Sequence, residues 1–328
     1  MQQRLFIQPY PLNTAVLLLI FNRLETTKQV FEAIRKAKPP RIYIAADGPR
    51  PGILDEKEKV RKVRDHVLDK IDWNCKVKTL LREKNLGCKY AVSSAISWFF
   101  ENEEMGIILE DDCLPSQSFF WFCEELLIRF KEDERVSIIS GRNHLGSWEK
   151  GNYSYFFTTG SIWGWASWSR AWRHCDLELE RFEDPVAMKT FDLFRCKVPL
   201  KANEIINGCK KVKKNELDTW DYQWAYSRII NNSYGVIPVR NLISNIGFSE
   251  DATHTTRLSK KEPSIYEIEF PLIHNDQMYV DYEYLNKCSD KPFASKILGV
   301  ISKLIPDLIK KKMPKYIKDY LNHLFLKT

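Results

Sequence analysis

The sequence of 328 residues lacks the short motifs that mark several large classes of protein. Its eight cysteines form no C-x-x-C pair and no cysteine–histidine ladder with zinc spacing, so we expect no structural zinc site. The apolar run at residues 15–21 is too short to span a membrane. The net charge is +7, but no helix-turn-helix, zinc-finger or RNA-recognition signature accompanies it. We therefore expect no nucleic-acid partner.

Signs of export and of disorder are also missing from the sequence. Residues 1–13 do not show the order of basic segment, apolar run and cleavage site that marks a secretory signal. We therefore expect reduced cysteines and a cytoplasmic protein. Hydrophobic residues make up 44% and charged residues 28% of the chain, which indicates a folded globular protein. No internal repeat or low-complexity linker divides it.

Tryptophan, in contrast, is plentiful, with ten in the chain. An indole packs well in a core, and its flat face also stacks on the apolar C–H face of a sugar ring. For any single tryptophan the core is the more frequent place. Four of the ten lie in one short segment, 160–172, which also suggests a surface for a sugar: Trp163, Trp165, Trp168 and Trp172.

The first half of the chain alternates between two kinds of segment. Short apolar runs predict buried strands at 15–21, 41–46, 77–81, 106–109 and 136–139. Helical spacing lies between them at 26–37, 55–70, 88–101 and 115–131. This alternation predicts a parallel sheet with helices on both faces.

The second half does not continue this pattern. Residues 153–158 and 234–238 are expected to form strands, and residues 201–214 and 218–230 helices. The tryptophan segment 160–172 is expected to be a turn followed by a helix, and 247–261 a polar loop.

Polar residues directly follow three of the predicted strands: Asn22-Arg23, Asp47-Gly48 and Glu110-Asp111-Asp112. Ligands of such sheets bind beyond the carboxyl ends of the strands. Arg23 has the fork shape that grips a phosphate, and Asp47 could accept an N–H from a nucleobase. The alternatives are a solvated loop for Arg23 and a simple Asp-Gly-Pro turn for Asp47.

The acid triplet is the strongest local signal. Three adjacent carboxylates repel one another, so a strand end gains nothing from them unless a cation is present. Mg²⁺ and Mn²⁺ bind through one or two carboxylates together with substrate phosphates. A solvated turn with helix-capping acids is the alternative, and the position directly after an apolar strand favours the metal.

Two further residues are candidates for chemistry. Asp221 lies between Trp220 and Trp224, and partial desolvation there would raise its pKa and suit a general base. The alternative is an acid in the first turn of a helix, where the dipole favours it. His254 lies in the polar loop near two acids, and it is of interest only as a further metal or phosphate ligand.

Taken together and in this order, these segments resemble the GT-A nucleotide-diphospho-sugar glycosyltransferases. Within them the chain is most similar to a bacterial branch related to the Golgi N-acetylglucosaminyltransferase I family. The segments that carry the resemblance are LLLIFNR at 17–23, IYIAADGPRPG at 42–52, REKNLGCKYAVSSAISWFF at 82–100, IILEDDCLPSQSFF at 107–120, GSIWGWASWSRAW at 160–172, TWDYQW at 219–224 and NIGFSEDATHT at 245–255.

The resemblance implies a Rossmann-like GT-A fold and a role for each matching residue on the donor side. Arg23 would contact the donor diphosphate, and Asp47 the uracil or its ribose. The acid triplet would be the family's variant of the D-x-D motif. In it Asp112 would bind Mn²⁺ or Mg²⁺ directly, and Asp111 would lie near the donor ribose or sugar. Glu110, Asp111 and His254 would bind the donor, with His254 a second contact to the metal.

On the acceptor side, the resemblance implies that Asp221 is the catalytic base. The spacing between the two tryptophans is one residue longer than in the Golgi enzyme, so Tyr222 or Gln223 could occupy the matching place. We prefer Asp221 because only a carboxylate accepts a proton at working pH. Trp163, Trp165 and Trp220 are expected near the acceptor.

The expected activity is inverting, metal-dependent transfer of a sugar from a UDP-sugar to a glycan or lipid-linked acceptor, in bacterial surface polysaccharide synthesis. Residues 1–260 would form the catalytic domain, with a nucleotide-sugar half at 1–140 and an acceptor half at 141–260. A sugar-1-phosphate nucleotidyltransferase is one alternative, although no glycine-rich loop follows the first strand. A non-catalytic sugar-binding protein is the other.

The remaining residues, 261–328, would form a C-terminal extension of basic amphipathic helices. Apolar residues of 295–309 fall near one helical face, and a lysine cluster follows at 310–315. That pattern suits an interfacial helix on anionic lipid, which would make the protein peripheral on the inner face of a membrane. Packing of this segment on the catalytic domain is the alternative.

Overall fold

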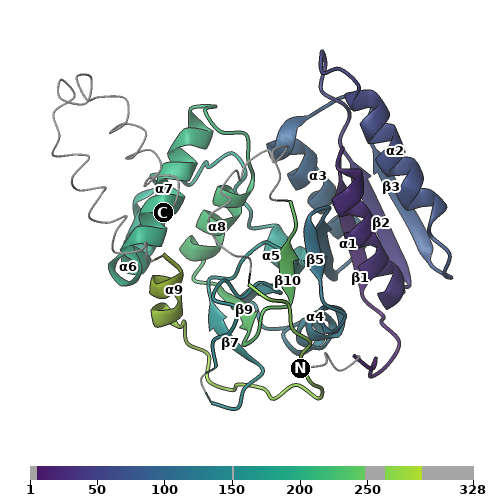
Figure 1. The fold of residues 1–328 in the computed structure, drawn as a ribbon. Helices are drawn as coiled ribbons and strands as arrows, with labels where there is room; N and C mark the ends of the chain where they lie inside the picture. The colour runs from purple at the N-terminus through teal and green to yellow at the C-terminus, as the bar shows by residue number, and fades with distance from the viewer. Residues whose placement is uncertain (1–5, 150, 248–262, 290–328) are drawn as a thin grey trace, which may run out of the picture.

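The computed structural model describes residues 6–149, 151–247 and 263–289 as an α/β structure built on one large sheet (Figure 1). The strand order in this eight-stranded sheet is β3-β2-β1-β4-β8-β6-β9-β7. Its strands are β1 (Ala15–Ile20), β2 (Arg41–Ala46), β3 (Lys76–Leu81), β4 (Met105–Glu110), β6 (Val136–Ser140), β7 (Tyr155–Thr158), β8 (Trp165–Trp168) and β9 (Tyr234–Pro238). Only β8 and β7 run antiparallel to their neighbours.

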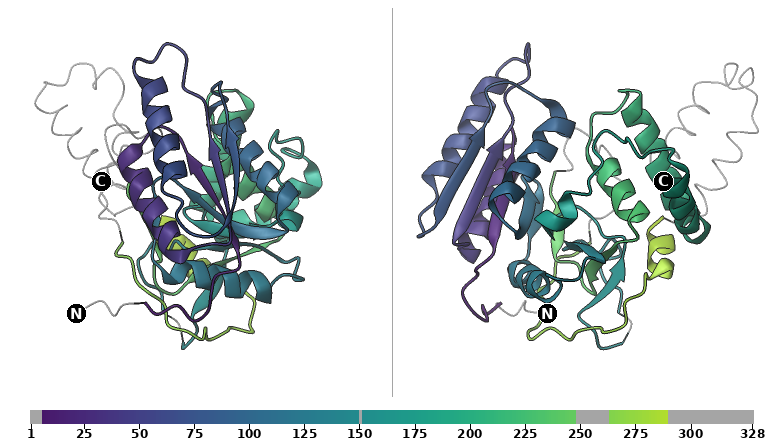
Figure 2. Two further views of the ribbon diagram at one scale, coloured as in Figure 1. Left: turned by 90° about the vertical axis from the view of Figure 1, so that its right-hand side faces the viewer. Right: turned by 180° about the vertical axis from the view of Figure 1, so that it is seen from behind.

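Helices cover both faces of this sheet, as Figure 2 shows from two further sides. They are α1 (Leu24–Ala37), α2 (Glu56–Asp69), α3 (Gly87–Asn102), α4 (Ser118–Arg129), α5 (Ser169–Trp172), α6 (Pro185–Lys197), α7 (Pro199–Lys213), α8 (Asp221–Ile230) and α9 (Tyr282–Ser289). The predicted α/β class, with a mostly parallel sheet between helices, is confirmed. None of the described helices is long and apolar enough to cross a bilayer.

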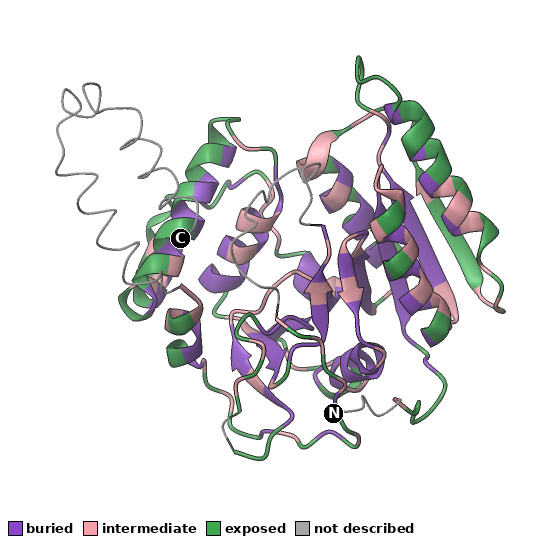
Figure 3. Cartoon of the chain, viewed as in Figure 1, coloured by how far each residue is buried: buried purple, intermediate pink, exposed green. Residues whose placement is uncertain are grey.

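Strand β1 shows why the sheet needs helices on both faces. Val16 and Leu18 belong to a core cluster with residues of α1, α2 and α4, whereas Leu17 and Leu19 belong to a second cluster with residues of α3. Successive side chains of a strand point to opposite faces, so a continuous apolar run is buried on both. In Figure 3 the inner strands are buried, while the edge strand β3 is largely exposed.

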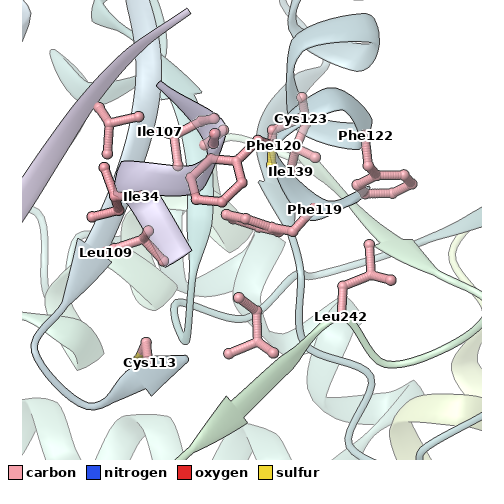
Figure 4. Packing of buried hydrophobic residues seen from close by; sticks show 14 of the residues in the cluster. Ile34, Ile107, Leu109, Cys113, Phe119, Phe120, Phe122, Cys123, Ile139 and Leu242 are labelled. Carbon is pink, nitrogen blue, oxygen red and sulfur yellow. The ribbon is translucent and has the colours of Figure 1, made fainter. Parts of the chain in front are cut away.

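Helix α4 closes one of these clusters with a run of aromatic residues. Phe119 and Phe120 are fully buried and pack in the same cluster as Ile107 and Leu109 of β4 (Figure 4). The helix predicted at 115–131 begins later than expected, at Ser118. Residues Cys113–Pro115 instead form a short strand, β5, which pairs antiparallel with β10 (Ile243–Asn245). The pairing depends on a strand more than a hundred residues away, which local spacing does not indicate.

The tryptophan segment is also built differently from the prediction of a turn and a helix. Residues Trp165–Trp168 form β8, which inserts antiparallel between β4 and β6, and only the short α5 follows it. Aromatic residues favour strands, and both faces of β8 are covered. Trp165 packs in the cluster with α3, and Trp168 in the cluster with α4.

Two helices of the second half differ from the sequence-based prediction. Helix α8 begins at Asp221, so Asp218 lies in the preceding loop and not in its first turn. Helix α6 was not predicted, although Asp184 and Pro185 form a recognisable start signal. The Asp184 side chain accepts hydrogen bonds from the backbone N–H groups of Val186 and Ala187, at 3.0 and 2.9 Å.

Residues 263–289 are the described part of the predicted C-terminal extension. Ile268 and Leu272 are buried in the core cluster of α1 and α4, and α9 packs in a third cluster with α6, α7 and α8. This part of the extension therefore shares the core of the preceding residues. The amphipathic pattern at 295–309 lies outside the described residues.

Candidate active site

A cavity of about 730 Å³ lies beyond the carboxyl ends of β1, β2 and β4. Because these strands are parallel, the polar residues that follow them meet at one edge of the sheet. The loop before α8 supplies the opposite wall. Most of the predicted site residues line this cavity: Arg23, Asp47, Glu110, Asp111, Asp112, Trp163, Trp220 and Asp221. His254 lies outside the described residues.

Arg23 binds two members of the acid triplet. Its Nη1 donates to Asp112 Oδ2 at 2.9 Å, and its Nη2 donates to Asp111 Oδ1. The positive charge of Arg23, just after β1, thus lies against the negative charges of Asp111 and Asp112, just after β4. A side chain at Gly247 would collide with Asp112 and Arg23, so this glycine lets the loop after β10 approach the pair. The sequence marked Arg23 and the acids separately but did not show that they pair.

The remaining negative charge of the triplet is poorly compensated. Asp111 is 3% exposed, and its Oδ2 makes no hydrogen bond within the described structure. Burial, and then the charges of Asp112 and Asp111, raise the pKa of Glu110 above its ordinary value. Burial also raises the pKa of Asp111, although Arg23 opposes this shift. Among the described residues, Arg23 is bonded to two of the three acids, Asp111 and Asp112, and not to Glu110.

The acids could hold a cation only together with a ligand. Among the described residues, no group of three or more histidine, cysteine or acidic side chains could hold a metal by itself. Mg²⁺ and Mn²⁺ are often held by one or two carboxylates plus substrate phosphates, and they prefer oxygen ligands. Asp112 lines the cavity, and Asp111 Oδ2 is buried without a hydrogen-bond partner in the described structure, so these two carboxylates are the candidates for such a contact.

Asp47 organises the loop in front of α3. Its carboxylate accepts hydrogen bonds from the Asn85 side chain at 2.8 Å and from the backbone N–H groups of Leu86 and Gly87, at 3.0 and 3.2 Å. It also accepts one from Gly48 at 2.9 Å. Its oxygens are therefore engaged by the protein, and any contact that it makes with a nucleoside stays a prediction.

The sequence did not indicate an ion pair between the buried Glu56 and the partly exposed Arg50, which lines the cavity. Glu56 is 2% exposed and accepts hydrogen bonds from Asn22 Nδ2 at 2.9 Å and from the backbone and guanidinium of Arg50. Those bonds hold the pKa of Glu56 below its ordinary value. The Arg50 guanidinium also lies 5.7 Å from the centre of the Phe21 ring. The only sequence signal was a charged helix start, which usually means exposure.

Asp221 faces the cavity from the first turn of α8. Its Oδ1 accepts hydrogen bonds from Thr219 Oγ1 at 2.6 Å and from the backbone of Tyr222 at 2.8 Å. Gln223, by contrast, is fully buried and bonds to the Thr219 carbonyl. Tyr222 lines the cavity, but burial and the charges of Asp221 and Glu204 raise its pKa to about 12. Of the three candidates, Asp221 is the carboxylate that lines the cavity, and its role as the base stays a prediction.

The three tryptophans predicted near the acceptor differ in their exposure. Trp163 is half-buried and lines the cavity, and the Arg142 guanidinium lies 5.0 Å from its ring centre. Trp220 also lines the cavity but is only 2% exposed. Trp165 is 1% exposed and stacks on Trp220 with ring centres 5.9 Å apart. The prediction for Trp165 is therefore wrong, because a core indole cannot offer its face to a sugar.

Cys88, at the start of α3, is a lining residue that the sequence reasoning did not select. Burial, and then the carboxylates of Glu110, Asp218, Asp221 and Asp47, raise the pKa of its thiol. These four acids come from both walls of the cavity. The sequence did hold a signal, because the first residues of a helix that follows a strand end lie at the same edge of the sheet.

Comparisons with known proteins do not assign the chain to a family. No protein-family model and no curated protein sequence matches it. Among solved structures it is similar to HddC from Yersinia pseudotuberculosis, at 14% identity and a TM-score of 0.27. That match covers 39% of this chain and 57% of the HddC chain.

Two other similar structures match a larger share of this chain. A UDP-glucose pyrophosphorylase complexed with UDP-glucose is 8% identical over 71% of this chain and 93% of its own, with a TM-score of 0.35. The galactosyltransferase LgtC, in complex with donor and acceptor sugar analogs, is 9% identical over 86% of this chain and 99% of its own, with a TM-score of 0.34. Sequence identities and TM-scores this low support no inference about the activity of this chain.

Proposed function

We propose that this protein is a metal-dependent glycosyltransferase of the GT-A type, which moves a sugar from a nucleotide-sugar to an acceptor. One observation carries the proposal. The acid triplet at the end of β4 and the carboxylate of Asp221 open into the same cavity at the edge of a parallel sheet. A cation site for a diphosphate and a candidate base for a hydroxyl are what sugar transfer requires.

The donor would lie along the strand ends. Its diphosphate would reach Arg23 and the acids of the triplet, and its uracil and ribose would lie toward Asp47. Asp112, with Asp111 and the residue His254 outside the described structure, would hold Mn²⁺ or Mg²⁺. When bound, such a cation neutralises the charge that develops on a leaving diphosphate.

The acceptor would enter from the side of α8. Asp221 would take the proton of the attacking hydroxyl, and the half-buried Trp163 would flank the acceptor. Attack from the face opposite the leaving diphosphate, in one displacement, inverts the anomeric configuration, by the logic that applies to inverting glycosidases. An α-linked UDP-sugar would then give a β-linked product.

The acceptor class and cellular place are part of the same proposal. We propose a glycan or a lipid-linked acceptor in bacterial surface polysaccharide synthesis, on the cytoplasmic side of a membrane. The support is the basic and apolar pattern of residues 291–328, which suits contact with an anionic surface.

A metal-dependent release assay tests the proposal against its two alternatives. The protein is incubated with a panel of nucleotide-sugars and Mn²⁺, and the released phosphorus compound is identified. We expect the release of a nucleoside diphosphate. A nucleotidyltransferase would cleave a nucleotide-sugar only when pyrophosphate is added, and would then release a nucleoside triphosphate and a sugar 1-phosphate. A sugar-binding protein would release nothing. The Asp112→Ala variant should lose this release while staying folded. Asp65→Ala, which removes an exposed acid on α2, should keep it. Normal turnover by a folded Asp112→Ala variant would show that Asp112 is not part of the catalytic site.

A further inference from the structure

The N-terminus of α3 is bound by two carboxylates that come from opposite walls of the cavity. Asp47 accepts hydrogen bonds from the backbone N–H groups of Leu86 and Gly87. Asp218 accepts those of Cys88 and Lys89, with Oδ2 at 2.7 Å and Oδ1 at 2.9 Å. The first N–H groups of a helix have no partner within it, and Leu86, at the cap position, supplies no side-chain bond of its own. Asp218 therefore completes this helix start from a loop 129 residues further along the chain.

Asp218 also belongs to the loop that carries the candidate base. The segment 217–222, between α7 and the first turn of α8, lines the cavity. Only Thr219 and Trp220 separate Asp218 from Asp221. Thr219 donates to Asp221, and Trp220 is buried against Trp165 and Trp172. A short segment anchored at both of these points leaves Asp221 little freedom to move relative to α3.

Two neighbouring features support the contact between Asp218 and the N-terminus of α3. Gly87 has a φ of +77°, and a side chain on it would come within 2.5 Å of the Asp218 carboxylate. Glycine is thus required both for the backbone conformation and for the close approach. Next to it, Lys89 Nζ binds Glu178 Oε2 at 2.8 Å, which adds a more exposed contact between α3 and the second half of the chain.

We infer that Asp218 is a positioning residue for sugar transfer: by binding the N-terminus of α3, it fixes Asp221 opposite the ends of β1, β2 and β4, where the donor would lie. This inference rests on the function proposed above. Asp218 touches no reacting atom in this account. Its effect should therefore appear in turnover and not in donor binding, because residues 85–87, on the side where the donor would lie, keep their own bonds to Asp47.

The chain contains a matched control for this role. Asp184 also accepts two backbone N–H bonds at a helix start, at 3.0 and 2.9 Å, but it does so as the N-cap residue of α6 itself and lies outside the cavity lining. Removing either cap should loosen one helix start. Only removal of Asp218 should displace the base, and a displacement of about 1 Å can reduce turnover by about 100-fold.

The test compares Asp218→Ala, Asp218→Asn and Asp184→Ala in steady-state transfer and in backbone hydrogen exchange. For Asp218→Ala we expect kcat to fall by about 10- to 100-fold, with donor KM within about twofold of wild type. An asparagine side chain keeps one of the two acceptor oxygens, so Asp218→Asn should recover part of this loss. Exchange of the peptide that contains residues 86–89 should rise in Asp218→Ala and stay unchanged in Asp184→Ala.

The outcomes separate this inference from the proposed function. If wild-type protein transfers sugar and both alanine variants keep similar kcat values, the positioning role is overturned and the function stands. A fall in donor affinity with unchanged kcat would also overturn it. If wild-type protein transfers no sugar from any nucleotide-sugar, the function and the positioning role fail together.

Discussion

Replacing Arg23 by alanine is the most direct test of how the acid triplet is stabilised. Arg23 is the described cation that binds both Asp111 and Asp112, and the side chains of these acids are 4% and 13% exposed. After the substitution, Asp111 would remain buried with no counter-charge on either oxygen. We therefore expect a large loss of stability that an added divalent cation partly restores.

The size of this loss can be worked out from the burial of the groups. Removing one partner of a buried ion pair costs about 3–5 kcal/mol, because the other charge stays buried and unpaired. Arg23 itself is 23% exposed, and water can partly replace it, so we expect the lower end, about 3 kcal/mol. Arg61 provides the comparison. It pairs with Glu58 and Asp65 on α2 but is 61% exposed, so Arg61→Ala should cost no more than about 1 kcal/mol.

Urea denaturation of wild type, Arg23→Ala and Arg61→Ala, with and without MnCl2, measures both effects. The midpoint of Arg23→Ala should fall most without metal. Mn²⁺ should raise that midpoint more than it raises the wild-type midpoint, because the acids then lack a competing guanidinium. Equal losses in the two variants would refute the burial argument. A manganese effect no larger in Arg23→Ala than in Arg61→Ala would show that the acids do not attract the cation.

Two further predictions concern the base and the tail. Asp221→Asn should keep donor binding in a titration but lose about 10²–10⁴-fold in kcat, as loss of a general base does; an active Asp221→Asn beside an inactive Gln223→Ala would assign the role to Gln223. Truncation after Asp290 should reduce co-sedimentation with anionic vesicles at low salt, since each lysine near the surface contributes about 1 kcal/mol. If the full chain and the truncated chain sediment equally little, residues 291–328 do not bind the membrane.

The order of the elements and the place of the site could be predicted from local signals. Apolar runs that end in polar clusters marked β1, β2 and β4, and the parallel arrangement then put Arg23, Asp47 and Asp112 at one edge. These signals are local because burial on both faces requires an unbroken apolar run, and a strand end needs a residue type that stops it. The same reasoning failed where pairing is between distant segments, as for β8 and β5.

What the sequence by itself determined is the class of fold and the edge of the sheet at which chemistry is possible, because both follow from patterns within a few consecutive residues. Only the tertiary structure decided which charges meet. It pairs Arg23 with acids 88 and 89 residues away, and it sets Asp218 against the start of α3. It also buries Trp165, which looked like a sugar platform in the sequence. Burial and ion pairing depend on what lies opposite a side chain in space, and sequence spacing carries no record of that.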